Sequence, residues 1–398
     1  MYYLGLDFGT SGARGVIMDE SETEMWSAQI AYPSPQQQDA AIWHETLFEL
    51  LARIPAAFRA GLQTIAMDAT SGTVLLVDDE LNPVTPVLLY NHPLSGDPAA
   101  KLAWLKQHHH GHAARYLMHQ ADYLNAHLTG VGGVSDYHNA LKSGLDIRTL
   151  AWRDGIYAAE DVALLPRIVA PGTIIGKVQR RIARHFNLNS ACIVKAGTTD
   201  SIAAFIAAGV HTPGVAVTSL GSTLVLKLLS ERYVASPQHG VYSHRFGKWW
   251  LVSGASNSGG AVLRQFFSDE ELTRYSQQIP AEIASELDYY PLPRVGERFP
   301  VNDAGLAPRL TSRPNDDVTF LHGLLEGMAR IEQQGYAKFA ELGATPLQQV
   351  LTAGGGSRNR QWQAIRQRRL GVPVAIAKNT DAAFGSAILA KGLDWLAE

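Results

Sequence analysis

The sequence predicts an α/β protein of two domains, and three observations lead to this prediction. The chain has 398 residues, which exceeds one ordinary hydrophobic core, and 46% of them are hydrophobic. Short apolar runs alternate with helix-favouring segments along the chain. A strand, a Gly/Ser/Thr turn and a second strand open the chain, and the same pattern recurs at residues 215–229. We therefore expect a duplicated domain, whose two turns face one another across a cleft.

The charge balance limits the partners that we expect. The chain carries 34 Lys and Arg against 37 Asp and Glu, a formal charge of −3, and no basic stripe suggests nucleic acid binding. No apolar segment has the length needed to cross a bilayer, and the N-terminus lacks a basic leader region. We expect a cytoplasmic protein without membrane or nucleic acid partners. Cys192 is the only cysteine, which excludes an intramolecular disulfide.

The first element is a predicted β-hairpin, with strands at residues 2–8 and 13–18 and a turn at residues 9–12. Backbone N–H groups and the hydroxyls of Thr10 and Ser11 at such a turn suit phosphate oxygens. Asp7 directly precedes the turn, and a carboxylate beside phosphate requires a cation such as Mg²⁺. An ordinary hairpin turn explains the same residues equally well.

A third strand at residues 26–31, a helix at 43–57 and a buried strand at 64–68 follow. Ser71 lies in the next turn, before a strand at residues 73–77, and small hydroxyl-bearing residues there suit a polyol ligand. On its own, Ser71 is more typical of a simple turn. Residues 91–105 are rich in Pro, Gly and Ala, and residues 116–128 have a helical pattern.

Asp200 is the central candidate. The apolar run 191–194 leads through a Gly-Thr-Thr turn into a helix that extends to residue 208, so the aspartate lies at a strand-to-helix corner. Ligands of open α/β folds bind at such corners. A carboxylate there can cap the helix or act as a general base, and the local pattern leaves both interpretations open. Residues 211–214 resemble a boundary, which predicts domains at 1–209 and 210–398.

In the second half, strands at 215–218 and 224–229 enclose the turn 219–223, and a helix is predicted at 261–267. Residues 288–314 have no periodicity, and a long amphipathic helix follows at 320–342. A strand at 350–353 leads into Gly354, Gly355 and Gly356, where the backbone could approach a flat ring or form a loose turn. A helix to residue 369, a strand at 372–377 and a helix at 381–396 complete the chain.

Five motifs in this order resemble those of the FGGY carbohydrate kinases, which belong to the actin-like ATPase superfamily with Hsp70 and actin. They are Asp7-Phe8-Gly9-Thr10-Ser11-Gly12, Gly197-Thr198-Thr199-Asp200, Ser219-Leu220-Gly221-Ser222-Thr223, Thr352-Ala353-Gly354-Gly355-Gly356 and Asp381-Ala382-Ala383-Phe384-Gly385. The resemblance spans the chain and is strongest to the short cyanobacterial and plant D-ribulose kinases, with which it shares residues 68–76, 89–91, 135–140 and 288–293.

The resemblance implies two ribonuclease-H-like α/β domains with ATP and a sugar in the cleft, the first domain on the sugar side and the second on the nucleotide side. Asp7 would hold the Mg²⁺ and the phosphates, and Asp200 would be the general base. The other implied contacts are Thr10 and Ser11 at the first phosphate hairpin, Gly221 and Ser222 at the second, Gly355, Gly356 and Asn359 in the nucleoside pocket, Trp362 beside the adenine, and Ser71 and Ser201 with Asp200 facing the sugar.

The implied reaction is ATP-dependent phosphorylation of D-ribulose to D-ribulose 5-phosphate. D-xylulose, L-ribulose or an alditol as acceptor remain alternatives, as does a nucleotide-binding protein with weak ATPase activity. Longer family members carry a Trp and an Asp-x-Arg where this chain has Leu89-Tyr90-Asn91-His92-Pro93, and the segment 91–103 is shorter than in close relatives. The sugar specificity of those longer members therefore does not transfer, and the sequence does not predict an oligomeric state.

Overall fold

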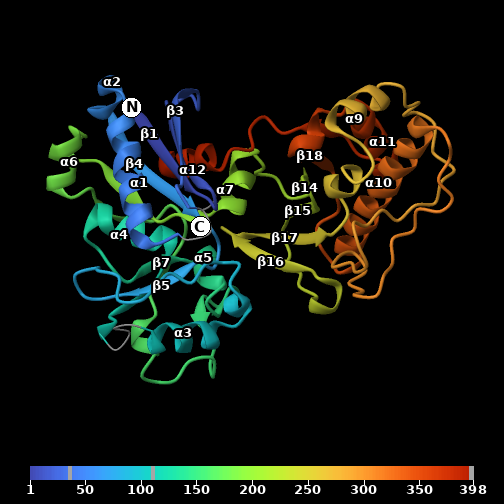
Figure 1. Cartoon of the computed structure of the whole chain (residues 1–398). Helices are drawn as coiled ribbons and strands as arrows, with labels where there is room; N and C mark the ends of the chain where they lie inside the picture. Colours follow the sequence, from blue (N-terminus) through green and yellow to red (C-terminus); the bar gives the residue numbers. More distant parts are fainter. Residues whose placement is uncertain (35–37, 109–112, 394–398) are drawn as a thin grey trace. The chain divides into compact units, whose positions relative to one another are not determined.

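The computed structural model describes residues 1–34, 38–108 and 113–393 of the chain (Figure 1). The chain divides into two compact units: unit 1 contains residues 1–207 and 381–398, and unit 2 contains residues 208–380. Within the described ranges, none of the helices combines the length and the apolar character that crossing a membrane requires.

Unit 1 is built on a mixed sheet in which the strands lie in the order β11-β12-β4-β1-β2-β3. β1 (Tyr2–Phe8), β2 (Gly12–Met18) and β3 (Glu24–Ala31) form an antiparallel meander, and β4 (Leu62–Ala69) is parallel to β1. β12 (Ile193–Lys195) and the short β13 (Thr198–Thr199) both pair with β4 in parallel, and β11 (Ile174–Lys177) forms the edge. Parallel pairing places the carboxyl ends of β1, β4 and β13 at one edge of the sheet.

Helices cover this sheet because their apolar sides match its buried residues. They are α1 (Ala40–Arg53), α4 (Gln120–Thr129), α6 (Arg180–Phe186), α7 (Asp200–Ala207) and α12 (Ala382–Lys391), whereas the short α2 (Ala56–Arg59) has no buried residue. A smaller part of unit 1 contains β5 (Val74–Val77), α3 (Pro98–Gln107), β6 (Tyr116–His119), β7 (Val134–Asp136), α5 (Tyr137–Leu141), β8 (Leu145–Asp146), β9 (Ala151–Trp152) and β10 (Arg167–Val169).

Unit 2 repeats this plan with the strand order β16-β17-β15-β14-β18-β19. Its strands are β14 (Val215–Leu220), β15 (Leu224–Ser230), β16 (Tyr242–Phe246), β17 (Trp249–Ser256), β18 (Gln349–Ala353) and β19 (Val374–Ile376). Its helices are α8 (Gly260–Leu263), α9 (Asp269–Ser276), the long α10 (Asp317–Glu341) and α11 (Arg360–Leu370), with a 3₁₀ turn η6 (Gly355–Arg358) between β18 and α11.

The two sheets have corresponding pairings, which confirms the predicted duplication. In unit 1, β1 is antiparallel to β2 and parallel to β4. In unit 2, β14 is antiparallel to β15 and parallel to β18. Each unit has its own buried hydrophobic core: Leu4, Leu6 and Trp43 belong to the first, and Leu226, Leu324 and Phe339 to the second.

The domain limits 1–209 and 210–398 stay predictions, and by packing the closing helix groups with unit 1. The chain passes into unit 2 at Ala208, close to the predicted boundary, but α12 returns to unit 1. Glycines allow this return, because a Cβ at Gly385 would lie 1.9 Å from the Ala203 carbonyl oxygen of α7. A Cβ at Gly5 of β1 would lie 1.9 Å from the Ala383 carbonyl oxygen. The backbone of α12 therefore packs directly on α7 and β1.

Other elements also differ from the sequence predictions, and three of them show why. Residues 116–119 form β6, which pairs with β5, and the expected helix begins only at Gln120. The helices α3 and α9 were not predicted, since α3 lies in the Pro/Gly/Ala-rich segment and α9 is largely polar.

Candidate functional site

The first glycine turn of unit 1 presents two unused backbone donors. The Gly9 N–H closes the turn on the Gly12 carbonyl at 3.0 Å. The Gln38 side-chain amide donates to the Thr10 carbonyl at 2.6 Å, and the Tyr32 N–H donates to the Ser11 carbonyl at 2.9 Å. The N–H groups of Thr10 and Ser11 donate to no group within the described ranges, and both residues are exposed. The Thr10 and Ser11 N–H groups can thus donate to an anion, while the carbonyls of the same residues accept hydrogen bonds within the protein.

Carboxyl groups from two neighbouring strands meet at the end of β1. Asp7 and Asp68 are partners in the parallel pairing of β1 with β4, and Ser386 Oγ of α12 donates to Asp68 Oδ2 at 2.6 Å. Asp68 is fully buried, and the Oδ1 atoms of Asp7 and Asp68 are buried without a donor. Ionised carboxylates can only accept, so a proton or a cation would supply the partner that these two oxygens lack.

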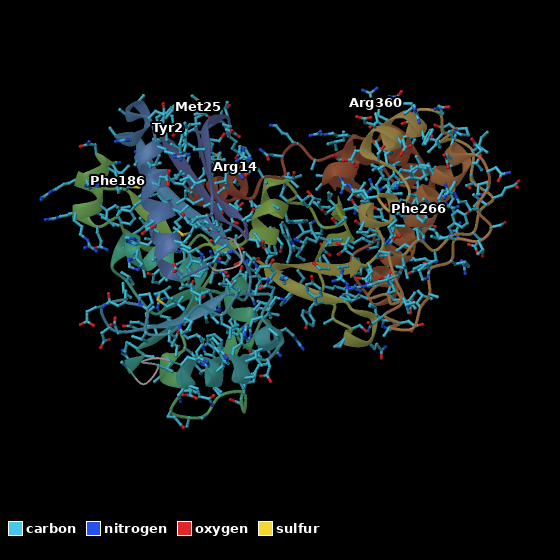
Figure 2. All side chains as sticks on the ribbon, viewed as in Figure 1. Tyr2, Arg14, Met25, Phe186, Phe266 and Arg360 are labelled. Carbon is cyan, nitrogen blue, oxygen red and sulfur yellow. The ribbon has the colours of Figure 1, made fainter. Side chains whose placement is uncertain are left out.

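The electrostatics of this cluster follow from burial. Burial raises the pKa of Asp7 to about 6, a hydrogen bond from Asp68 opposes this, and the charges of Asp200 and Asp381 raise the pKa further. Burial and the charge of Asp7 raise the pKa of Asp68 well above its usual range. Arg14, which is labelled in Figure 2, lowers the pKa of Asp7 and forms an ion pair with Asp381. The cluster thus has an excess of negative charge, which favours a cation.

The turn after β4 carries Ser71, whose hydroxyl has no hydrogen-bond partner in the described part of the chain. Its neighbours hold the turn in place: Thr70 Oγ1 lies 2.8 Å from Thr73 Oγ1 and donates to Gln120 Oε1 at 2.7 Å. The Thr73 hydroxyl also accepts the Tyr90 N–H at 3.1 Å. Tyr90 OH in turn accepts from Thr10 Oγ1 at 3.2 Å, which connects the Ser71 turn with the first glycine turn.

Asp200 is the first residue of α7, at the strand-to-helix corner that the sequence predicts. Its Oδ1 accepts the Ser201 N–H at 2.6 Å. The preceding strand is held by α5, because His138 Nδ1 lies 2.7 Å from Thr198 Oγ1 and Asn139 Nδ2 donates to the Thr198 carbonyl at 3.2 Å. Asp200 therefore extends from a rigid support, which is a requirement for a positioned acid or base.

The second glycine turn, in unit 2, has the same construction as the first. The Gly221 N–H closes the turn on the Thr223 carbonyl at 3.2 Å. At the start of α8, the Gly260 N–H donates to the Gly221 carbonyl at 2.9 Å, and the Ala261 N–H donates to the Ser222 carbonyl at 3.1 Å. In unit 2, every residue of which is described, the N–H groups of Ser222 and Thr223 donate to no other group. This turn also has free donors for an anion.

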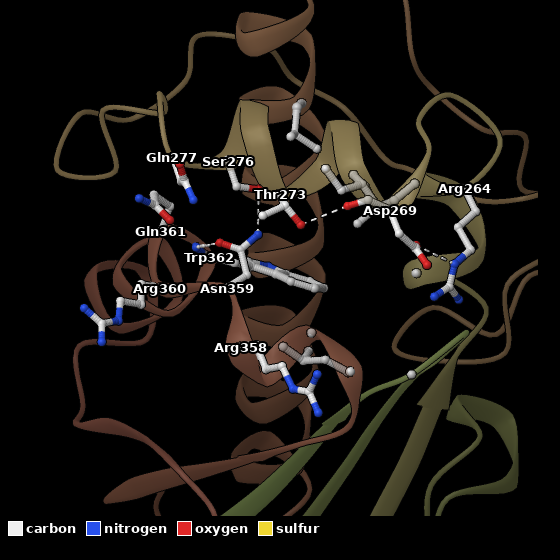
Figure 3. A pocket seen from close by; sticks show the side chains of 18 of the residues that line it. Arg264, Asp269, Thr273, Ser276, Gln277, Arg358, Asn359, Arg360, Gln361 and Trp362 are labelled. Carbon is white, nitrogen blue, oxygen red and sulfur yellow. Dashed lines mark hydrogen bonds and ion pairs between the residues drawn. The ribbon is translucent and has the colours of Figure 1, made fainter.

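A cavity of about 1060 Å³ adjoins this turn within unit 2 (Figure 3). It is lined by Gly221 and Ser222, by α9, and by the segment from Gly355 to Trp362. This volume is at the upper end of the range typical for small-molecule sites. The cavity brings Gly221, Ser222, Gly355, Gly356, Asn359 and Trp362 together, and their role in binding a nucleotide stays a prediction.

The residues of this segment differ in what they offer to a ligand. A Cβ at Gly355 would meet no atom within 4 Å, so its backbone faces open space. A Cβ at Gly356 would lie 2.7 Å from the Trp362 ring, and Trp362 is only 2% exposed, so its indole forms a wall behind Gly356. Asn359 uses both amide atoms within the protein: Oδ1 accepts the Trp362 N–H at 2.9 Å and Nδ2 donates to Ser276 Oγ at 2.8 Å.

Several residues at these sites were not singled out from the sequence. Asp68 was assigned only to a buried strand, although an aspartate inside an apolar strand is itself a signal, because unpaired buried carboxylates are rare. Arg14 lies opposite Asp7 in the antiparallel pairing of β1 with β2, and Tyr90, in the loop after β5, contacts Thr10. Both positions follow from tertiary contacts and not from local sequence. The cleft and the expected roles of all candidate site residues stay predictions: Asp7, Thr10, Ser11, Ser71, Asp200, Ser201, Gly221, Ser222, Gly355, Gly356, Asn359 and Trp362.

Comparisons with known proteins agree with this fold and these motifs. Residues 91–207 match the N-terminal domain, and residues 216–391 the C-terminal domain, of the FGGY family of carbohydrate kinases. A xylulose kinase from Streptomyces coelicolor is 27% identical, over 98% of this chain and 87% of the relative. One from Klebsiella pneumoniae is 24% identical, over 91% of this chain and 83% of the relative.

A solved structure described as a xyloylose kinase from Brucella ovis superimposes with a TM-score of 0.87 at 25% identity, covering 100% of this chain and 92% of that chain. The two repeated α/β units and these matches define a carbohydrate kinase with the two-domain fold of the actin-like ATPases. The chain belongs to the FGGY family, since models of both of its domains match and together cover more than half of the residues.

Proposed function

We propose that the protein transfers the terminal phosphate of ATP to a ketopentose, forming D-ribulose 5-phosphate from D-ribulose. Membership of the FGGY carbohydrate kinases is the observation that carries the proposal. The preference for D-ribulose rests on the motifs shared with the short D-ribulose kinases, in particular residues 68–76 and 135–140.

In this proposal, unit 2 holds the nucleotide in the cavity beside Gly221 and Ser222. The free N–H groups of the two glycine turns bind phosphate oxygens, as backbone donors do in other phosphate sites. The open backbone of Gly355 supports close approach of the nucleoside, with Gly356, Asn359 and Trp362 forming the wall of its pocket.

A magnesium ion fits the carboxyl cluster of unit 1. The buried Asp7 Oδ1 has no donor, and an oxygen of this kind is a preferred ligand of Mg²⁺, bound directly or through water. Among the described residues, no group of three His, Cys, Asp or Glu side chains could hold a metal alone. Phosphate oxygens and water would therefore complete the ligand set, which is common for Mg²⁺. When bound, the ion supplies charge compensation for the phosphates.

Asp200 acts as the general base, and Ser71 and Ser201 bind the sugar hydroxyls. The attacking hydroxyl oxygen forms a bond to the terminal phosphorus, the bond from that phosphorus to the ADP oxygen breaks, and Asp200 receives the hydroxyl proton. An alcohol has a far higher pKa than an aspartate, so the proton moves late, as the new bond forms. Positioning and charge stabilisation supply most of the rate in such reactions.

D-xylulose is the second candidate acceptor, and the names of the curated relatives favour it. D-ribulose and D-xylulose differ in configuration at one carbon, so the same hydroxyl donors and acceptors can bind either sugar.

The experiment is a coupled assay of ADP release with Mg·ATP and a panel of D-ribulose, D-xylulose, L-ribulose and alditols. Stimulation by D-ribulose supports the proposal, and stimulation by D-xylulose alone changes the acceptor. ADP release that no sugar stimulates would contradict the transfer reaction and indicate a weak ATPase.

Asp200→Ala tests the base. We expect a loss of sugar-dependent ADP release of at least about 100-fold, since general acid–base catalysis contributes about 10²–10⁴-fold, while ATP binding is kept. Asp79→Asn is the control, because this exposed carboxylate of unit 1 forms a surface ion pair with Arg115. Near-normal turnover of Asp200→Ala would remove Asp200 from the base role.

A further inference from the structure

The large cavity of unit 2 is lined by three arginines, and only one of them has an acidic partner. Arg264 forms an ion pair with Asp269, with 3.1 Å between Nε and Oδ1. In unit 2, which is described without gaps, the guanidinium groups of Arg358 and Arg360 form no ion pair or hydrogen bond. Asp269 is the sole acidic residue of the lining. Two positive charges at the cavity are therefore not compensated by the protein.

The two arginines lie at different places along the cavity. Arg358 ends the turn η6, which contacts β14 and β18. The glycines before it pack on the residue that precedes the second glycine turn, since a Cβ at Gly354 would lie 2.7 Å from the Leu220 carbonyl oxygen. Arg360 is the first residue of α11, directly after Asn359, which is bonded to α9. In Figure 3 the two side chains leave the backbone on different sides of Asn359.

Arg358 also lines a second, smaller cavity. This space of about 250 Å³ lies at the carboxyl ends of β18 and β19, with Gly354, Ser357 and Thr380 in its lining. Gly355 and Arg358 are the two residues that line both cavities. Arg358 is exposed, so its guanidinium can reorient without breaking a contact in the protein. Arg358 thus lines the same two cavities as Gly355, whose backbone faces open space.

We propose that Arg358 is a polyphosphate-binding residue of this cavity, and that Arg360 is not. The inference rests on the proposed use of the cavity for ATP. The polyphosphate carries several negative charges, whereas the Ser222 and Thr223 amides offer only neutral donors. A planar guanidinium binds phosphate oxygens through two parallel hydrogen bonds, which makes arginine well suited to this role.

The test is calorimetric titration of the purified protein with ATP and with adenosine, using Arg358→Gln and Arg360→Gln. For Arg358→Gln we expect a dissociation constant for ATP that is about 10- to 100-fold higher, because a charge-assisted hydrogen bond contributes about this factor. Adenosine affinity should change less than about twofold, since adenosine lacks phosphate. Arg360→Gln is the matched control, with the same change of charge at the same cavity and no expected ATP-selective loss.

Arg358→Lys separates charge from geometry. We expect it to recover part of the ATP affinity, because the charge is kept and the paired hydrogen bonds are lost. The ATP affinity of Arg358→Gln should also fall less with added salt than that of the unaltered protein, since one ionic contact is missing.

Three results would overturn the inference: unchanged ATP affinity in Arg358→Gln, equal losses for ATP and adenosine, or an ATP-selective loss of the same size in Arg360→Gln. Failure of the proposed function gives a different result, because the unaltered protein would then bind no ATP or transfer no phosphate to a sugar.

Discussion

Replacing Gly385 by alanine tests how closely α12 packs on α7 within unit 1. The added Cβ would lie 1.9 Å from the Ala203 carbonyl oxygen and 2.6 Å from its carbonyl carbon. Non-bonded heavy atoms attract one another at separations of about 3.5 Å and repel at much shorter ones. One of the two helices must therefore move by more than about 1 Å. The obstacle is backbone, and no change of rotamer can remove it.

Two effects of opposite sign contribute to the stability change. Alanine is favoured over glycine inside a helix by about 1 kcal/mol. Overpacking of a well-packed site costs about 1–3 kcal/mol and occasionally more. Because the clash is with backbone and is severe, we expect the steric cost to exceed the propensity gain, with a net loss of about 2 kcal/mol in the free energy of unfolding of unit 1.

The assay is urea unfolding followed by circular dichroism, comparing transition midpoints at equal slope. Gly96→Ala is the matched control in the same unit, because a Cβ at Gly96 would meet no atom within 4 Å. Turnover should also fall in Gly385→Ala, since α7 begins with Asp200. A Gly385→Ala protein that is as stable as the unaltered chain, or about 1 kcal/mol more stable, would refute the close packing.

Further predictions concern buried charges and the metal. Arg366 donates two hydrogen bonds to Glu332, and both side chains are 1% exposed. Glu332→Ala leaves the arginine charge buried without its partner, so it should destabilise unit 2 by about 3–5 kcal/mol in urea unfolding. A loss below about 1 kcal/mol would contradict this prediction. Burial raises the pKa of Glu326, but the nearby His322 and hydrogen bonds from Arg368 and Arg369 outweigh it and hold the pKa at about 2, below the ordinary 4.5. As the pH falls, the unfolded state therefore binds the proton at Glu326 before the folded state does. The free energy of unfolding should decrease between about pH 4.5 and pH 2. A Glu326→Gln protein should lack this part of the pH dependence. Asp7→Asn should raise the Mg²⁺ concentration for half-maximal sugar-dependent ADP release by about tenfold, and an unchanged requirement would remove Asp7 from the metal site.

Local patterns predicted most elements of the two sheets. The turns at residues 9–12 and 219–223 were found because glycine and hydroxyl residues interrupt alternating apolar strands, a signal that needs no distant partner. α9 was missed, although Ser268 and Glu271 form a capping box that marks its start. β6 was missed because an apolar run that continues into a helix has no period of its own.

The candidate sites depend more strongly on distant contacts. A strand-turn-helix pattern predicted the place of Asp200, and the glycine run after β18 suggested the candidate nucleotide residues, whose roles stay predictions. The carboxyl cluster could not be predicted, because Asp68 meets Asp7 through the register of β1 and β4, and meets Ser386 across more than 300 residues of sequence. The contact between the Trp362 ring and Gly356 also could not be predicted from local sequence patterns.

The amino-acid sequence alone determined the α/β class, the duplicated plan, and the motifs of an FGGY carbohydrate kinase, because glycine turns and apolar periodicity are encoded within a few residues of each position. Only the tertiary structure decided that α12 packs in unit 1, that Asp7 lies beside Asp68, and that Arg358 has no acidic partner within unit 2. These properties arise from backbone packing and from burial of charge, which depend on residues far apart in the chain.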